Sequence, residues 1–224
     1  MVQRIITLGD STMQFNPYNK FPQTGWPQAL VRFIRPEVEI KNFAVNGKST
    51  KNFIELKLFE KALNEIGEQD LVLIEFGHND QKIEDPTRYT KPFEGYQSNL
   101  REMVECCTKR GAHVILLTPI AQRNFKDGVL VESHGDYPKA MMELASQMKV
   151  PCIDLYTLTK DVLRQEGEEL SKRFYMNFGS GLYENHPYGL TDDTHLRYDG
   201  AFMVANCFYK AMKSRNLFPE LFLE

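Results

Sequence analysis

Short apolar runs recur along the chain and are separated by segments of a different periodicity. Most of these runs carry few polar side chains, which is typical of strands buried on both faces of a parallel sheet. They predict strands at residues 4–8, 38–43, 71–74, 113–117 and 152–155. Gly9 directly follows the first run, and a glycine there favours a sharp turn at the end of that strand.

Between the runs, apolar residues are spaced three and four positions apart, as on one face of an amphipathic helix. This spacing predicts helices at residues 26–34, 53–66, 93–109, 137–148 and 201–213. Alternating strands and helices indicate parallel strands that are joined by right-handed crossovers, with helices on both faces of the sheet. We therefore expect a three-layer α/β/α sandwich with a five-stranded parallel sheet.

The domain organisation follows from the length and from the absence of interruptions in the sequence. The chain has 224 residues, which suits one α/β domain with a sizeable core. No repeat, low-complexity tract or Pro/Gly/Ser-rich linker divides it. We expect a single domain that spans residues 1–224, and its oligomeric state is either a monomer or a homodimer.

Charge and cysteine content narrow the function classes. The net charge of −3 gives no drive towards nucleic acid or anionic lipid, and no apolar stretch is long enough to span a membrane. The four cysteines form no C-x-x-C pair, so we expect structural thiols and neither a metal nor a cofactor. The N-terminal residues lack a leader pattern, and a cytoplasmic location is expected.

Polar residues that follow the predicted strands are the candidates for chemistry. Parallel α/β sheets bind ligands at the carboxyl ends of their strands, and these ends share one edge. The polar segments at this edge are residues 9–12, 46–47, 77–80 and 118–119. A later loop, residues 191–195, precedes the last predicted helix and can fold over the same edge. All of these candidates therefore converge on one site.

The residue types in these segments suit acyl transfer. Ser11 follows a strand and a tight turn, where a serine is exposed as a nucleophile. His195 is the candidate base, and Asp192, three residues earlier, can hold its Nδ1–H while Nε2 faces outward. The backbone N–H groups of Ser11 and Gly47 and the side-chain amide of Asn79 can supply the donors that a developing oxyanion needs.

These segments resemble the four sequence blocks of the SGNH (GDSL-type) hydrolases. The blocks correspond here to residues 9–11, 42–47, 77–80 and 192–195, in the family order and across almost the whole chain. Similarity to the rhamnogalacturonan acetylesterase branch lies in residues 9–13, 24–26, 77–80, 118–119 with Arg123, 134–138, and 192–195 followed by 200–201. The resemblance implies a flavodoxin-like fold and an esterase that removes acetyl groups from pectin-type oligosaccharides.

Site residues carried over from the resemblance agree with the chemistry above. It implies that Ser11 is the nucleophile, that Asp192 and His195 complete the triad, and that Ser11, Gly47 and Asn79 form the oxyanion hole. Polymer-degrading members of the branch are secreted, whereas this chain shows no leader pattern. We therefore expect it to act on acetylated oligosaccharides. An SGNH esterase that acts on another acylated sugar or on a lipid is the nearest alternative.

Alternatives outside this family are weaker. A metal-dependent phosphoesterase could use Asp10, His78, Asp80, Asp192 and His195 as ligands, but it would leave Ser11 and Asn79 without a role. Residues 47–50 resemble the end of a phosphate-binding loop. That motif also needs a glycine at position 42, where this chain has Asn42, so nucleotide binding is not expected. A carbohydrate-binding module would need no nucleophile, base and orienting carboxylate together.

Four further assignments rest on weaker patterns. Arg123 is expected to be a solvated loop arginine, with recognition of a uronate carboxylate as the alternative. Residues 167–190 carry several aromatic side chains and are expected to shape a sugar pocket. Asp10 and Asp80 are expected to cap turns or helices rather than to act in catalysis. The C-terminal residues 217–222 are expected to dock either on their own domain or on a second subunit.

Overall fold

A five-stranded parallel sheet runs through the centre of the computed structural model, which describes residues 2 and 4–223. Its strands are β1 (Arg4–Gly9), β2 (Glu39–Asn42), β3 (Leu71–Glu75), β4 (His113–Leu117) and β7 (Cys152–Ile153), in the spatial order β2-β1-β3-β4-β7. Every pairing between these strands is parallel. The sheet confirms the predicted fold class and all five predicted strands.

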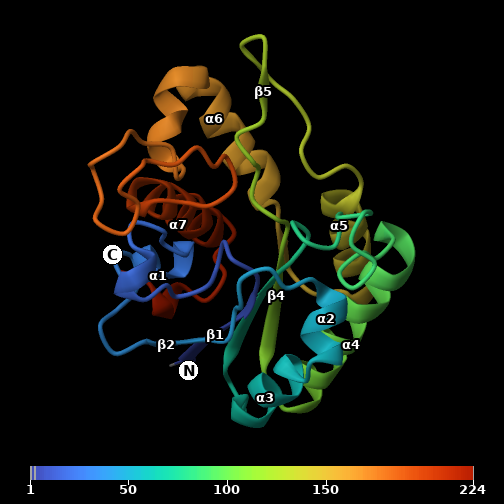
Figure 1. The fold of residues 1–224 in the computed structure, drawn as a ribbon. Coiled ribbons are helices and arrows are strands. Elements are labelled where there is room, and N and C mark those ends of the chain that lie inside the picture. The colour runs from blue at the N-terminus through green and yellow to red at the C-terminus, as the bar shows by residue number, and fades with distance from the viewer. Residues whose placement is uncertain (1, 3, 224) are drawn as a thin grey trace.

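Helices cover both faces of the sheet, as Figure 1 shows. The α-helices are α1 (Trp26–Leu30), α2 (Thr50–Glu55), α3 (Leu58–Glu65), α4 (Gln97–Lys109), α5 (Tyr137–Met148), α6 (Leu155–Ser171) and α7 (Tyr198–Ser214). Shorter helical turns are at Tyr18–Lys20, Pro92–Tyr96, Lys172–Phe174 and Pro219–Leu221. None of the described helices is long and apolar enough to cross a membrane.

The alternation of side chains along each strand divides the core into two halves. Ile5, Leu73 and Ile115 face α1, α6 and α7, where Trp26 and Phe208 pack with ring centroids 5.3 Å apart. Ile6, Val72 and other residues of opposite register face α2 to α5. Strands that bury both faces need apolar residues at every position, which explains the runs seen in the sequence.

Several predicted helix and strand boundaries are wrong for local reasons. The predicted helix at 26–34 ends at Leu30, since residues 31–33 form a turn and Ile34 bridges to Phe222. The predicted helix at 53–66 is two helices, because Lys57 takes a left-handed conformation with φ of 57°. The strand that begins at Cys152 ends at Ile153, where Asp154 caps α6 by accepting a hydrogen bond from the Thr157 N–H.

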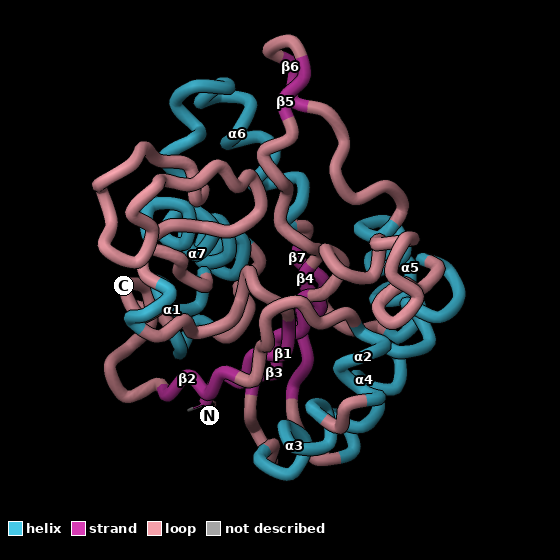
Figure 2. The backbone as a smooth tube through the Cα atoms, viewed as in Figure 1, coloured by secondary structure: helices cyan, strands magenta, loops and turns pink. Residues whose placement is uncertain are grey.

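Helix α6 and the strands β5 and β6 were not predicted. Helix α6 carries polar residues around much of its length and contains Gly167 in a non-helical conformation, which masks its periodicity. Strands β5 (Phe125–Lys126) and β6 (Val129–Leu130) form a hairpin that projects from the molecule (Figure 2). Its turn is Asp127-Gly128, and both residues have positive φ. An Asp-Gly pair between short strands is a recognised hairpin signal that could have identified it.

The C-terminal segment docks on its own chain. The Arg35 N–H donates to the Leu221 carbonyl at 2.9 Å, and the Leu223 N–H donates to the Phe33 carbonyl at the same distance. Leu221 and Phe222 are buried, and the Phe222 ring contacts those of Phe208 and Tyr209. Of the two docking modes expected for residues 217–222, the structure therefore shows the intramolecular one.

Phe208 of α7 packs against Trp26 of α1, and this contact predicts how truncating the Phe208 ring changes the stability of the protein. Phe208 is fully buried, so Phe208→Ala should lower the free energy of unfolding by about 3–5 kcal/mol through lost burial and a residual cavity. Phe202, on the same helix, is 38% exposed and provides a matched control, Phe202→Ala, with a clearly smaller loss. Urea unfolding measures both, and equal losses would contradict this packing.

Candidate functional site

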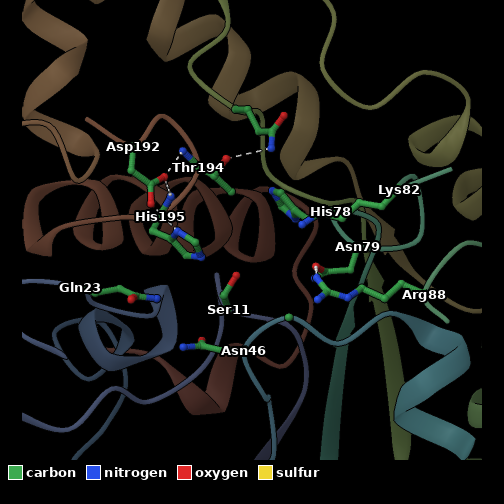
Figure 3. A pocket seen from close by; sticks show the side chains of 12 residues that line it. Ser11, Gln23, Asn46, His78, Asn79, Lys82, Arg88, Asp192, Thr194 and His195 are labelled. Carbon is green, nitrogen blue, oxygen red and sulfur yellow. Dashed lines mark hydrogen bonds and ion pairs between the residues drawn. The ribbon is translucent and has the colours of Figure 1, made fainter. Parts of the chain in front are cut away.

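A cavity of about 420 Å³ opens at the carboxyl edge of the sheet, where the sequence placed the candidate residues. It is lined by Ser11, Gln23, Asn46, Gly47, His78, Asn79, Lys82, Arg88, Gln122, Asp192, Thr194 and His195. Figure 3 shows their side chains around a common centre. All five residues predicted for the site line this one cavity, although they come from four separate segments of the chain.

Ser11 lies in a tight turn after β1. Gly9 is required at the start of this turn, because a Cβ atom there would lie 2.8 Å from the Glu75 carbonyl oxygen. The Asp10 carbonyl accepts hydrogen bonds from the N–H groups of Met13 and Gln14, which closes the turn. Among the described residues, neither the hydroxyl nor the N–H of Ser11 donates to a protein acceptor, so both groups are available to a ligand in the cavity.

His195 and Asp192 form a pair above Ser11 (Figure 3). His195 Nδ1 lies 2.6 Å from Asp192 Oδ2, while Asp192 Oδ1 accepts from the N–H groups of Thr194 and His195. Burial raises the pKa of Asp192, but the hydrogen bond and charge of His195 outweigh it, so the pKa lies below its ordinary value. Asp192 is therefore ionised near neutral pH and holds Nδ1, which leaves Nε2 directed towards the cavity.

Gly47 and Asn79 supply hydrogen-bond donors on the opposite wall. Gly47 has φ of 73°, in the left-handed region that favours glycine, and its N–H has no protein acceptor among the described residues. Asn79 Nδ2 donates to the Lys48 carbonyl at 3.1 Å, and Asn79 Oδ1 accepts from Arg88 Nη1 at 3.3 Å. These two contacts fix the amide orientation and leave one Nδ2 hydrogen free for a ligand.

The loop that carries Asp192 and His195 is anchored from behind by Arg123. Arg123 Nη1 lies 2.8 Å from Asp193 Oδ1, and Arg123 also donates to the Glu168 carbonyl and to the Ser171 hydroxyl. Its side chain is only 5% exposed. Both expectations for Arg123 are therefore wrong, because it is neither solvated nor part of the cavity wall. A buried arginine with several acceptors holds their segments in place.

A buried polar network lies beneath Ser11. Trp26 Nε1 donates to Glu75 Oε2 at 2.7 Å, and the Thr12 hydroxyl lies 2.9 Å from Glu75 Oε1 and 3.0 Å from Asp10 Oδ1. That hydroxyl has one hydrogen, so it can donate to only one of the two carboxyl groups. Burial and the neighbouring Asp10 charge raise the pKa of Glu75 to about 7. A protonated Glu75 can donate to Thr12, which then donates to Asp10.

His78 continues this network to the cavity wall. Its Nδ1 lies 3.3 Å from Asp10 Oδ2, and both side chains are almost fully buried. Burial opposes the charge on both groups, but their mutual attraction prevails, so the pKa of His78 is raised and that of Asp10 is lowered. Each charged form therefore stabilises the other. His78 thus lines the cavity and also pairs with Asp10 behind it.

Asp80 connects the Asn79 loop to the start of α2. Its carboxyl oxygens accept from the Thr50 N–H and from the hydroxyls of Thr50 and Thr90. Burial raises the pKa of Asp80 to about 7, although these hydrogen bonds oppose the shift. Asp80 thus has the supporting role expected from the sequence. Among the described residues, no three His, Cys, Asp or Glu side chains are grouped to hold a metal ion.

Some lining residues were not predicted, and one predicted segment does not contribute. Lys82, Arg88 and Gln122 lie in loops whose course depends on tertiary contacts, so no local sequence pattern places them in the cavity. The aromatic residues of segment 167–190 are absent from the lining residues. Tyr175 is buried in the core, whereas Tyr188 is 93% exposed. The expectation that this segment shapes the pocket is wrong.

The profile of the GDSL-like lipase/acylhydrolase family matches residues 7–200. Rhamnogalacturonan acetylesterase RhgT of Bacillus subtilis is 34% identical over 96% of this chain and 91% of its own length. Probable rhamnogalacturonan acetylesterase YesY of the same organism is 30% identical over 97% and 95% of the two chains.

A solved structure has the same fold at lower identity. The acetylxylan esterase Axe2 of Geobacillus stearothermophilus superposes with a TM-score of 0.66 and 16% identity, and the match covers 93% of each chain. At this level of identity the likeness concerns the fold alone.

The raised pKa of Glu75 predicts how stability changes with pH. The pKa of Glu75 in the folded state is about 7, above its ordinary value of 4.5. The protonated carboxyl therefore contributes its full stabilisation of the fold below pH 4.5, and this stabilisation is lost as the pH rises through 7. The loss is on the order of 3 kcal/mol. Glu75→Gln resembles the protonated carboxyl, because its oxygen can accept from Trp26 and its amide can donate to Thr12. The free energy of unfolding of Glu75→Gln should be close to that of the wild type in acid and should exceed that of the wild type at alkaline pH.

Urea unfolding at about pH 5 and about pH 8 measures this difference. Glu102→Gln, on the exposed face of α4, is the control and should follow the wild-type dependence at both values. A Glu75→Gln difference that stays constant between the two pH values would show that Glu75 carries no raised pKa.

Proposed function

The chain belongs to the GDSL-like lipase/acylhydrolase family, and we propose that it is a serine esterase that removes acetyl groups from carbohydrate, with acetylated rhamnogalacturonan oligosaccharides as substrates. The observation that carries this proposal is the Asp192–His195 pair above Ser11 in the cavity shared with Gly47 and Asn79. The similarity to RhgT and YesY over nearly the full chain supports the acetylated carbohydrate. The proposal takes residues 1–224 as one domain.

In the first half of the proposed reaction, His195 acts as general base and Ser11 as nucleophile. His195 Nε2 takes the hydroxyl proton of Ser11 while Ser11 Oγ bonds to the acetyl carbonyl carbon. The carbonyl oxygen becomes an oxyanion, which the N–H groups of Ser11 and Gly47 and the Nδ2 of Asn79 stabilise. The bond from carbon to the sugar oxygen then breaks, and His195 returns the proton to that oxygen.

In the second half, water releases the acetyl group. His195 takes a proton from a water molecule, whose oxygen attacks the acyl carbon bound to Ser11. The same donors stabilise the second oxyanion. Its collapse breaks the bond to Ser11 Oγ, His195 protonates that oxygen, and acetate leaves. The ionised Asp192 stabilises the imidazolium in both halves and keeps the ring in place.

The experiment that tests this function is acetate release from p-nitrophenyl acetate and from acetylated rhamnogalacturonan oligosaccharides. Ser11→Ala should reduce turnover by roughly 10⁴-fold or more, because the covalent route is lost. Ser180→Ala, in an exposed loop outside the cavity lining, is the matched control and should behave as the wild type. Addition of EDTA should leave the wild-type rate unchanged.

Two outcomes would contradict the proposal. Acetate release that survives Ser11→Ala would remove Ser11 as nucleophile, and release abolished by EDTA would favour a metal-dependent hydrolase. The ratio of rates on the two substrates tests the carbohydrate preference separately.

The oxyanion hole gives a second prediction. Asn79→Ala removes one of three donors and should lower kcat by about 10²–10³ while KM changes little, because the lost bond is made mainly in the transition state. Circular dichroism and thermal unfolding establish that the variant is folded. Steady-state kinetics with the acetylated oligosaccharide measure the effect, and a wild-type kcat in the folded variant would remove Asn79 from the reaction.

A further inference from the structure

Arg88 lies in the cavity wall beside Asn79, and the proposed reaction gives it no role (Figure 3). Its Nη1 donates a hydrogen bond to Asn79 Oδ1 at 3.3 Å. A Cβ atom built on Gly47 would lie 3.7 Å from the same nitrogen, so the guanidinium also adjoins the segment that carries Gly47. Arg88 is thus next to the residues that supply two of the three proposed oxyanion donors.

The side-chain amide of Asn79 depends on its protein partners for its orientation. Asn79 is only 4% exposed, so bulk water has little access to replace a lost partner. Its Nδ2 donates to the Lys48 carbonyl, which can only accept, and its Oδ1 accepts from Arg88, which can only donate. An amide turned by 180° would place like groups against each other at both ends. The two partners together therefore allow one orientation, in which Nδ2 keeps a hydrogen for the oxyanion.

The hydrogen bond from Arg88 also changes the strength of Asn79 as a donor. A cation that donates to an amide oxygen draws electron density away from the amide nitrogen, and linked hydrogen bonds strengthen one another. The Nδ2 hydrogen consequently becomes a better donor. This gain matters most when the acceptor carries a full negative charge, as the oxyanion does in the transition state, and it matters less for the neutral carbonyl of the bound ester.

Asp85 holds the guanidinium in position for this contact. Arg88 Nε lies 2.9 Å from Asp85 Oδ2, while Asp85 Oδ1 accepts from the hydroxyl and the N–H of Thr87. The hydrogen bonds from Thr87, together with the charge of Arg88, keep the pKa of Asp85 below its ordinary value. The planar guanidinium can bind Asp85 through Nε and Asn79 through Nη1 at the same time, which suits an arginine at this position.

We propose that Arg88 is a positioning residue of the oxyanion hole, which orients the amide of Asn79 and strengthens its Nδ2 as a donor. The inference rests on the proposed esterase function and adds to its oxyanion hole a residue that acts through Asn79. Arg88 then contributes to the rate on any acetyl ester, whatever alcohol the ester carries.

Arg88→Met tests this role, because methionine keeps much of the side-chain length but has no donor and no charge. The kcat should fall about tenfold with little change in KM, since a partly exposed charged hydrogen bond is lost and it acts mainly in the transition state. The fall should be similar on p-nitrophenyl acetate and on the acetylated oligosaccharide, because both reactions form the same oxyanion.

Two comparisons separate this effect from a loss of structure. The loop should keep its shape in Arg88→Met, because the Lys51 ammonium still binds the Pro86 carbonyl, and thermal unfolding verifies that the variant is folded. Arg164→Met is the matched control. It removes an arginine from an ion pair with Asp161 that has the same i, i+3 spacing but lies outside the cavity lining, and it should keep the wild-type kcat.

A double-mutant cycle tests whether Arg88 acts through Asn79. When Asn79→Ala has already removed the amide, the added Arg88→Met should lower kcat by no more than about twofold. The full tenfold loss in that background would overturn the proposal, because Arg88 would then act independently of Asn79. A loss confined to the oligosaccharide would also overturn it, by making Arg88 a contact for the sugar.

The single variants separate failure of this inference from failure of the function. A wild-type kcat in Arg88→Met, with Asn79→Ala strongly impaired, would remove Arg88 from the oxyanion hole and leave the proposed esterase intact. A wild-type kcat in both folded variants would remove the proposed oxyanion hole and, with it, the role of Arg88.

Discussion

The architecture of the site depends on burying three carboxyl groups, those of Asp10, Glu75 and Asp80, at the carboxyl edge of the sheet. A buried carboxyl group is tolerated only when it is protonated, ion-paired or well supplied with hydrogen bonds. Meeting this condition connects segments that are far apart in sequence. Glu75 joins β3 to Trp26 and to the turn after β1, whereas Asp80 joins the loop after β3 to the start of α2.

These connections set the relative positions of the groups that face the cavity. Thr12, held by Asp10 and Glu75, is adjacent to Ser11, and Asn79 immediately precedes Asp80. Gly47 lies just before the segment that Asp80 caps and Asn79 just before Asp80 itself, so the same carboxyl group fixes the segments that carry two of the three proposed oxyanion donors. The Asp192 loop is fixed independently, through Arg123 and Asp193. Buried polar groups outside the cavity lining thus fix the positions of the side chains that line it.

The sequence predicted the sheet and the candidate residues for one shared reason. Doubly buried strands require apolar runs, and the polar residues at their ends mark the ligand-binding edge, so Ser11 and Asn79 stand out locally. Arg123 was misassigned because its burial depends on Glu168 and Asp193, which are distant in sequence. Gly167 hid helix α6, and no periodic pattern could place Lys82 or Arg88 on the wall of a cavity that tertiary folding creates.

Covalent trapping tests the proposed nucleophile, Ser11, most directly. A serine that attacks the phosphorus of a p-nitrophenyl methylphosphonate ester displaces p-nitrophenolate and keeps the methylphosphonyl group, and this adduct resembles the tetrahedral intermediate of acetyl transfer. Mass spectrometry of the digested protein should find one phosphonyl group on the peptide that contains Ser11, with esterase activity lost in proportion to labelling. Activity that persists without a label on that peptide, or a label on another residue that accompanies inactivation, would contradict the account.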